Sequence, residues 1–212
     1  CERNGRVLAL RGAVSVDCGA YMRANAAVPP RNVAQFLSGP YDVPNIHVES
    51  TVYLTNKAPI GTYRGPGRFE ADFFRERLFD IAARELGIDP VEFRRINLVK
   101  PAQMPFPLAT LNKPDKSEEL DSGDYRITLD RCLAEFGWTA KRGLQGRLID
   151  GKYHGIAVGC FIEGGAAGPK ETARIEIEDD GRITVYVGST NVGQGVVTVL
   201  TQIAADALEV PM

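Results

Sequence analysis

Two glycine-rich loops contain the residue types that best suit binding of an anionic ligand. In the first, Arg64 and Arg68 lie on either side of a Gly-Pro-Gly turn, and the second is the tripeptide Gly193-Gln194-Gly195. An arginine offers paired charged donors, a glutamine amide both donates and accepts, and a glycine lets a ligand approach the backbone. Loops of this kind suit a phosphate, or a polar heterocycle rimmed by oxygens.

Each loop precedes a predicted helix, whose N-terminus adds unpaired N–H groups and partial positive charge. The competing interpretation is that each loop is only a strand-to-helix turn. In the first loop, the arginines would then be solvated and Tyr63 would be a packing residue. Neither loop matches G-x-x-x-x-G-K-[ST], and RGPGRFE lacks the third glycine of the dinucleotide fingerprint. The residues alone therefore predict an anion-binding, two-domain α/β protein.

The elements around the first loop follow from periodicity and capping signals. Alternating apolar residues predict strands over 7–16 and 47–56, and residues 22–45, rich in Pro, Gly and Asn, are predicted as loop with short turns. A helix is predicted over 69–86, and a second one follows with Asp89 as N-cap and Glu92 closing a capping box. The predicted apolar face of the first helix is Phe74, Leu78, Ile81, Ala82 and Leu86. Its predicted solvent side includes Arg75, Glu76, Arg84 and Glu85.

The second half of the chain has its own pattern. The proline-rich residues 101–117 are predicted to be a linker, and a helix over 126–136 should end at Gly137. A strand is predicted over 155–164. Alternation around an Asp180-Gly181 turn predicts a hairpin, whose second strand leads through the Gly-Gln-Gly loop into a helix.

Composition limits the function classes. The 212 residues carry a net charge of -2, which argues against nucleic acid as a partner, and no run is long and apolar enough for a membrane span. Four scattered cysteines and two isolated histidines, with no C-x-x-C pair, argue against a His/Cys metal site. The chain starts and stops close to predicted elements, so we expect a piece of a larger polypeptide, with apolar patches exposed if it folds alone and self-association as the result.

Three segments resemble a known family, in the family's order and over nearly the whole chain. They are TNKAPIGTYRGPGRFEADFFRERLFDIAARELGIDPVEFRRINLV, DSGDY and VGSTNVGQGVVTVLTQIAADALEVP. They are similar to the molybdenum-cofactor-binding large subunit of xanthine dehydrogenase and aldehyde oxidase type enzymes. The resemblance implies a molybdopterin-dependent oxidoreductase that hydroxylates an aldehyde or N-heterocycle with water-derived oxygen, and passes electrons to iron–sulfur clusters and FAD on partner subunits or domains.

The resemblance also implies roles for residues of both loops. Tyr63, Arg64, Gly65 and Pro66 would face the molybdenum site, and Gly193, Gln194 and Gly195 would hold the pterin. Xanthine-oxidising relatives have a phenylalanine where this chain has Pro66, which counts against a purine substrate. Carbon monoxide dehydrogenases have a copper-binding cysteine where this chain has Gly65, which argues against that activity.

The family's catalytic base is a glutamate downstream of the Gly-Gln-Gly helix, beyond residue 212, so no residue here is assigned as the base. Glu163 and Glu171 are interpreted as surface or structural residues. We expect an α+β fold with mixed sheets and packed helices: residues 1–100 from the first cofactor domain, 101–117 as linker and 118–212 from the second. The isolated chain should lack turnover and bind little cofactor. The alternatives are a non-catalytic scaffold or anion-binding domain, and a nucleotide-binding enzyme. A cytoplasmic location is expected, with the periplasm as the alternative.

Overall fold

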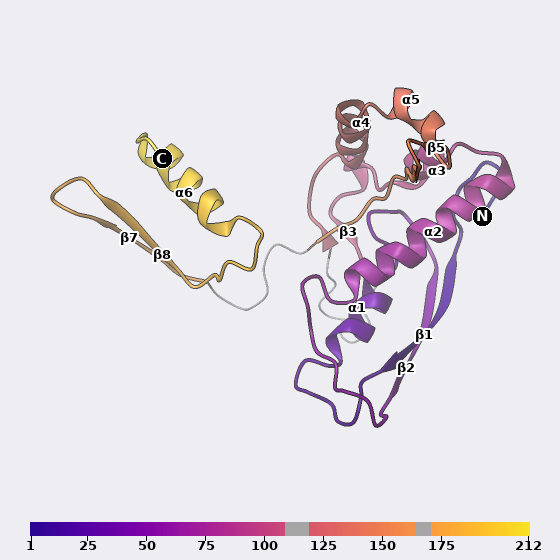
Figure 1. Cartoon of the computed structure of the whole chain (residues 1–212), viewed down its shortest axis with the longest axis horizontal. Helices are drawn as coiled ribbons and strands as arrows, with labels where there is room; N and C mark the ends of the chain where they lie inside the picture. The colour runs from indigo at the N-terminus through magenta and orange to yellow at the C-terminus, as the bar shows by residue number, and fades with distance from the viewer. Residues whose placement is uncertain (109–118, 164–170) are drawn as a thin grey trace. The chain divides into compact units, whose positions relative to one another are not determined.

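The computed structural model describes residues 1–108, 119–163 and 171–212. The chain divides into two compact units, residues 1–163 and 164–212, called unit 1 and unit 2 below. Each unit combines helices with two-stranded sheets, as the predicted α+β class requires (Figure 1).

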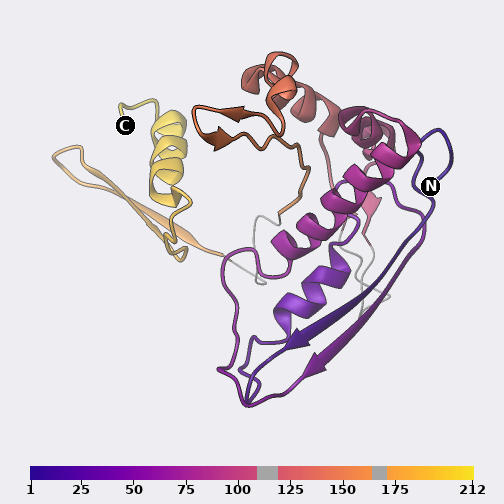
Figure 2. The same ribbon diagram turned by 45° about the vertical axis from the view of Figure 1, so that its right-hand side comes forward.

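Unit 1 begins with a β-α-β arrangement. Strand β1 (Leu10–Asp17) pairs in parallel with β2 (Ile46–Tyr53), from Leu10 opposite Ile46 to Asp17 opposite Tyr53. Both strands were predicted. Helix α1 (Val28–Gln35) connects them and lies between α2 and the strand pair (Figure 2). The prediction of loop over residues 22–45 was wrong here, because parallel strands need a crossover connection and a helix commonly provides it.

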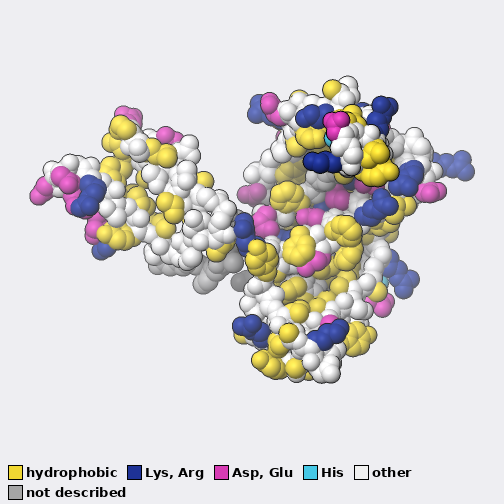
Figure 3. Space-filling view, viewed as in Figure 1, with side chains coloured by type: hydrophobic (Ala, Val, Ile, Leu, Met, Phe, Trp, Pro, Cys, Tyr) yellow, Lys and Arg dark blue, Asp and Glu magenta, His cyan; other side chains and the backbone are white. Residues whose placement is uncertain are grey.

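Helix α2 (Arg68–Leu86) confirms the predicted helix but not its predicted faces. Its buried residues are Ala71, Arg75, Phe79 and Ala83. Phe74, Leu78 and Ile81 remain 51%, 46% and 39% exposed, and Figure 3 shows hydrophobic side chains along the course of α2. The predicted apolar face was therefore wrong for the three large side chains, although Ala82 and Leu86 do pack against the core.

An arginine can be buried in α2 because its charge is fully partnered. The Arg75 guanidinium contacts Asp72 at 2.5 Å and Glu76 at 3.0 Å, and also donates to the carbonyl oxygen of Cys160 at 2.6 Å. Glu76 in turn accepts from Nε of Arg94 at 2.7 Å. Buried charges are tolerated in such fully hydrogen-bonded networks. The periodicity of the sequence could not predict this network, because a periodic pattern assigns every charged side chain to the solvent side of the helix.

Helix α3 (Pro90–Asn97) begins as predicted. The Asp89 carboxylate accepts from the backbone N–H groups of Val91 and Glu92, which confirms the N-cap. The Glu92 side chain lies instead 3.5 Å from Arg95, so the reciprocal half of the predicted capping box is replaced by an ion pair.

Helix α4 (Tyr125–Phe136) ends at Gly137 as predicted, and its Leu129 and Leu133 join the core cluster of α2 and α3. Residues 155–163 form neither a helix nor a strand, so the strand predicted there was wrong for its described part. Residue 164 lies outside the described residues. The remaining short elements of unit 1 are η1 (Pro101–Gln103), β3 (Phe106–Pro107), β4 (Glu119–Leu120), α5 (Trp138–Lys141), η2 (Arg142–Leu144), β5 (Leu148–Ile149) and β6 (Lys152–Tyr153).

The predicted domain boundaries stay a prediction. Of the linker expected over 101–117, residues 101–108 pack on unit 1 through buried Leu108, and residues 109–117 lie outside the described residues. Residues 119–163 group with unit 1 by their contacts, whereas the expected second domain began at 118.

Unit 2 contains the predicted hairpin and helix. Strands β7 (Ala173–Ile177) and β8 (Ile183–Val187) pair antiparallel around Gly181, whose φ of +83° suits the turn. Helix α6 (Val196–Leu208) follows the Gly-Gln-Gly loop and buries only Ala205. Most apolar side chains in the described part of this unit are exposed.

No helix in the described ranges has the length and hydropathy to cross a membrane. The cytoplasmic location stays a prediction.

The end of β1 is expected to respond to acid. The Asp17 carboxylate lies 2.9 Å from Nζ of Lys57, and it accepts hydrogen bonds from the Thr55 hydroxyl at 2.8 Å and the Gly19 N–H at 2.9 Å. These partners lower the pKa of Asp17 to about 2, and Lys57 has the largest effect. The stabilisation is fully present above pH 3.8, the ordinary pKa, and is lost as the pH falls through about 2. A carbon-13 NMR titration of the carboxyl group should show this midpoint, and Lys57→Met should raise it. A midpoint near 3.8 in the unchanged chain would contradict the assignment.

Candidate cofactor site

The first loop is a tight turn between β2 and α2. Gly65 and Gly67 have φ angles of +63° and +78°, and the Arg68 N–H donates to the Gly65 carbonyl at 3.0 Å. Positive φ angles of this size favour glycine, which explains the Gly-Pro-Gly sequence. Gly67 is the N-cap of α2 and makes no side-chain cap, so the helix N-terminus opens onto the turn.

Helix α1 holds this turn in place. The buried Asn32 side chain donates from Nδ2 to the Pro66 carbonyl at 2.9 Å. A Cβ placed on Gly67 would lie 2.2 Å from the Pro29 carbonyl oxygen, so helix and turn pack without spare room. Sequence reasoning missed Asn32, and the signal that was available is the Pro29-Pro30 pair, since proline favours the first helical positions.

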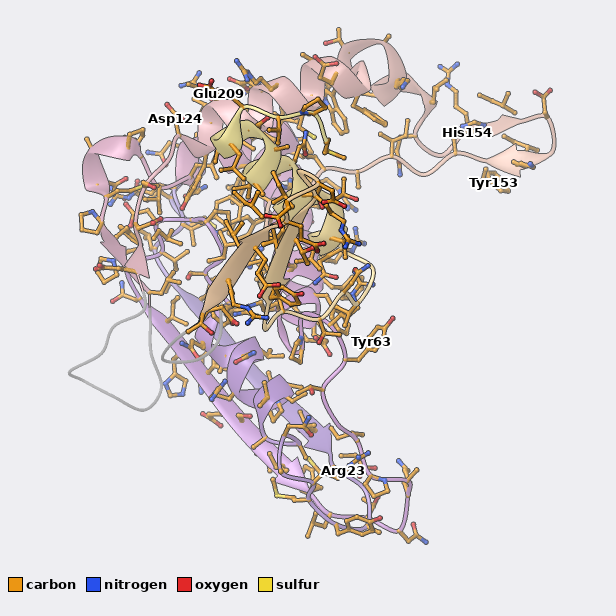
Figure 4. All side chains as sticks on the ribbon, turned by 90° about the vertical axis from the view of Figure 1, so that its left-hand side faces the viewer. Arg23, Tyr63, Asp124, Tyr153, His154 and Glu209 are labelled. Atoms are coloured by element: carbon orange, nitrogen blue, oxygen red, sulfur yellow. The ribbon has the colours of Figure 1, made fainter. Side chains whose placement is uncertain are left out.

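Tyr63 and Arg64 are directed to solvent in unit 1. Tyr63 is 76% exposed and points away from the ribbon in Figure 4, so the packing role considered for it is not seen within this unit. Arg64 is exposed as well. Both side chains are therefore accessible to a ligand at the turn.

Arg68 is engaged by the protein. Its Nη1 lies 2.5 Å from Oε1 of Glu163, and its guanidinium stacks on the Phe36 ring at 4.5 Å. Its Nε is buried and has no hydrogen-bond partner among the described residues. The two arginines of the loop thus differ: Arg64 is exposed, and Arg68 is partly neutralised. Glu163, interpreted from the sequence as a surface or structural residue, thus forms an ion pair within unit 1.

An apolar groove lies beside the turn. Phe69 and Phe74 of α2 line it together with Val33 of α1, and the Glu70 carboxylate, whose Oε2 is buried without a partner in the described part of the chain, also faces it. The other lining residues are Val14, Ser15, Val16, Pro29, Ile60, Gly61, Tyr63 and Pro66.

In the second loop, the side-chain amide of Gln194 forms hydrogen bonds with the backbone of the loop itself. Gln194 accepts from the Val192 N–H at 2.7 Å and donates to the Thr190 carbonyl at 3.4 Å. Gly193 and Gly195 have φ angles of +100° and +76°, and Gly195 is the N-cap of α6, without a side-chain cap or an acidic residue in the first turn. This N-terminus therefore keeps its positive partial charge uncompensated by its own helix.

The predicted site residues fall into two groups, one in each unit. Tyr63, Arg64, Gly65 and Pro66 form one turn, and Gly193, Gln194 and Gly195 form another. Taken separately, each turn suits an anionic group: the first offers the exposed Arg64 guanidinium and the N-terminus of α2, and the second offers the N-terminus of α6. The assignment of these seven residues to cofactor contacts stays a prediction.

Comparison with protein families matches both parts of the chain. Residues 1–98 match one molybdopterin cofactor-binding domain, and residues 131–212 match a second one. Together the two ranges include both glycine-rich loops, in the order that the sequence resemblance implied.

Relatives extend over almost the whole chain. The gamma subunit of the 6-hydroxypseudooxynicotine dehydrogenase complex of Paenarthrobacter nicotinovorans is 34% identical over 210 residues, covering 99% of this chain and 26% of that protein. The nicotine 6-hydroxylase large subunit of the same organism is 29% identical, covering 98% and 26%. Quinoline 2-oxidoreductase from Pseudomonas putida 86 superposes with a TM-score of 0.75 at 32% identity, covering 97% of this chain and 27% of that one. The chain thus spans about a quarter of the length of these relatives.

Proposed function

Because this chain belongs to the molybdopterin-cofactor-binding family of xanthine dehydrogenase and aldehyde oxidoreductase, we propose that it forms part of the large subunit of a molybdenum hydroxylase. The observation that carries the proposal is the ordered match of two cofactor-binding domains to the ranges that contain the two loops. The complete enzyme would hydroxylate a small molecule and transfer two electrons to iron–sulfur and flavin partner subunits.

The residues of this chain would bind and orient the cofactor. When bound, the molybdenum centre supplies two-electron oxidation of a C–H bond with oxygen from water, so that R–H and water give R–OH, two protons and two electrons. Arg64 would donate charged hydrogen bonds to anionic oxygens at the first turn. Gly65 would allow close approach there, and the uncapped N-terminus of α6 would stabilise negative charge at the second. The resemblance assigns the general base to a segment downstream of α6, so no residue of this chain is given that role.

An N-heteroaromatic substrate is the best supported class. The relatives at 34% and 32% identity are named for 6-hydroxypseudooxynicotine and for quinoline. Gly65 stands where the resemblance places the copper-binding cysteine of carbon monoxide dehydrogenases, which disfavours carbon monoxide. We also propose that remaining segments of the large subunit cover the exposed apolar face of α2, formed by Phe74, Leu78 and Ile81.

Oxygen-18 labelling tests the proposed reaction. The full-length protein, purified with its partner subunits, should convert quinoline or a pyridine to a hydroxylated product in labelled water with an artificial electron acceptor. The product should carry the label from water, and an aliphatic aldehyde should be turned over more slowly. Hydroxylation with oxygen from O₂, or none with either substrate class, would contradict the proposal.

A further inference from the structure

The carboxylate of Glu163 contacts the first loop, although Glu163 lies far from that loop in the sequence. Its Oε1 contacts Nη1 of Arg68 at 2.5 Å, and a Cβ placed on Gly65 would lie 3.5 Å from its Oε2. The carboxylate therefore lies against both the first residue of α2 and the turn that precedes it.

Three anchors fix the segment that carries Glu163. Val158 and Cys160 pack against the core cluster of α2 and α3, and Ile162 packs against a second cluster around Phe36. Between these contacts, Nη2 of the buried Arg75 donates to the Cys160 carbonyl at 2.6 Å. With the preceding residues held in this way, the position of the Glu163 carboxylate follows from the fold.

Charge explains what the carboxylate does at the turn. Arg68 occupies the first position of α2, where the helix dipole disfavours a cation, and the nearby Arg64 adds a second positive charge. Glu163 offsets the charge of Arg68 and holds its guanidinium over the Phe36 ring. Arg64 is then the exposed guanidinium of the turn.

We propose that Glu163 is a positioning residue for the cofactor site. By holding Arg68, it keeps the turn of Gly65, Pro66 and Gly67 in the conformation that presents Arg64 to an anionic cofactor. The identity of that cofactor rests on the proposed function, whereas the hold on the turn is a property of this chain alone.

Hydrogen exchange of the 212-residue chain tests the hold on the turn. In Glu163→Gln, exchange of the segment 62–68 should accelerate about fivefold, because the ion pair that restrains Arg68 is lost. The matched control Glu85→Gln, at an exposed position of the same helix, should stay within twofold of the unchanged chain. In an Arg68→Gln background, Glu163→Gln should add less than twofold, since it acts through Arg68.

Unchanged exchange in Glu163→Gln, or a full fivefold effect in the Arg68→Gln background, would overturn the proposal. If Glu163→Gln does not give a folded chain, Arg68→Gln alone replaces it, with the same expected acceleration and the same overturning result.

Molybdenum content of the full-length protein tests the consequence for the site. Glu163→Gln should lower molybdenum per chain about fivefold relative to Glu85→Gln. Faster exchange with unchanged molybdenum content would overturn the positioning role. A full-length protein that lacks molybdenum without any substitution would refute the proposed function, and the exchange result would still decide whether Glu163 holds the turn.

Discussion

Replacement of Glu76 by glutamine should lower the free energy of unfolding of unit 1 by about 3–5 kcal/mol, the usual cost of breaking a buried ion pair. The Glu76 side chain is only 13% exposed and lies between two guanidinium groups, at 3.0 Å from Arg75 and 2.7 Å from Arg94, both with 0% side-chain exposure. Tyr41 donates a further hydrogen bond to it at 3.2 Å. An amide in its place would leave two buried cations with less compensation.

Urea unfolding followed by fluorescence of Trp138, the one tryptophan of the chain, measures this loss. Trp138 packs against the core cluster that α2 and α3 share, so it reports on the affected unit. Glu85→Gln, on the exposed side of the same helix, should change the free energy of unfolding by no more than about 0.5 kcal/mol. Equal midpoints for the two variants would show that the buried network contributes little to stability.

Replacement of Gly67 by alanine should destabilise the chain by about 3 kcal/mol or more, because backbone strain and overpacking add at this position. Its φ of +78° disfavours any residue with a Cβ, and that Cβ would meet the Pro29 carbonyl at 2.2 Å and the Val33 nitrogen at 2.9 Å. Since these are backbone atoms, relief requires movement of α1 away from the turn.

Gly87, at the other end of α2, provides the matched control. Its φ of +68° imposes similar strain, but a Cβ there would meet nothing within 4 Å. Gly87→Ala should therefore cost only the strain, about 1–2 kcal/mol. Equal losses of unfolding free energy in the two variants would mean that α1 can move away from the turn without destabilising the chain.

Local signals predicted much of the fold. The Asp89 cap, the glycine ends of α2 and α4 and the hairpin around Gly181 each depend on residues that are neighbours in the sequence, and the structure confirms them. Helix α1 was missed because its eight residues include buried polar side chains such as Asn32, which hide its apolar face.

Long-range pairing explains the other differences. Arg75 is buried because its partners include a carbonyl of Cys160, and no periodic pattern along α2 contains that information. For the candidate site, the glycine turn was predictable from its own residues. Its two supports were not, since Asn32 and Glu163 reach the turn from distant segments.

Molybdenum and pterin analysis tests the central claim most directly. The full-length protein, purified from its own host, would be measured beside this 212-residue chain. We predict molybdenum near one atom per full-length chain, together with pterin fluorescence. We predict none in the 212-residue chain, because under the proposed function this chain would supply only part of the cofactor contacts. A full-length protein without molybdenum would contradict the account and favour a non-catalytic scaffold that retains the fold of its relatives.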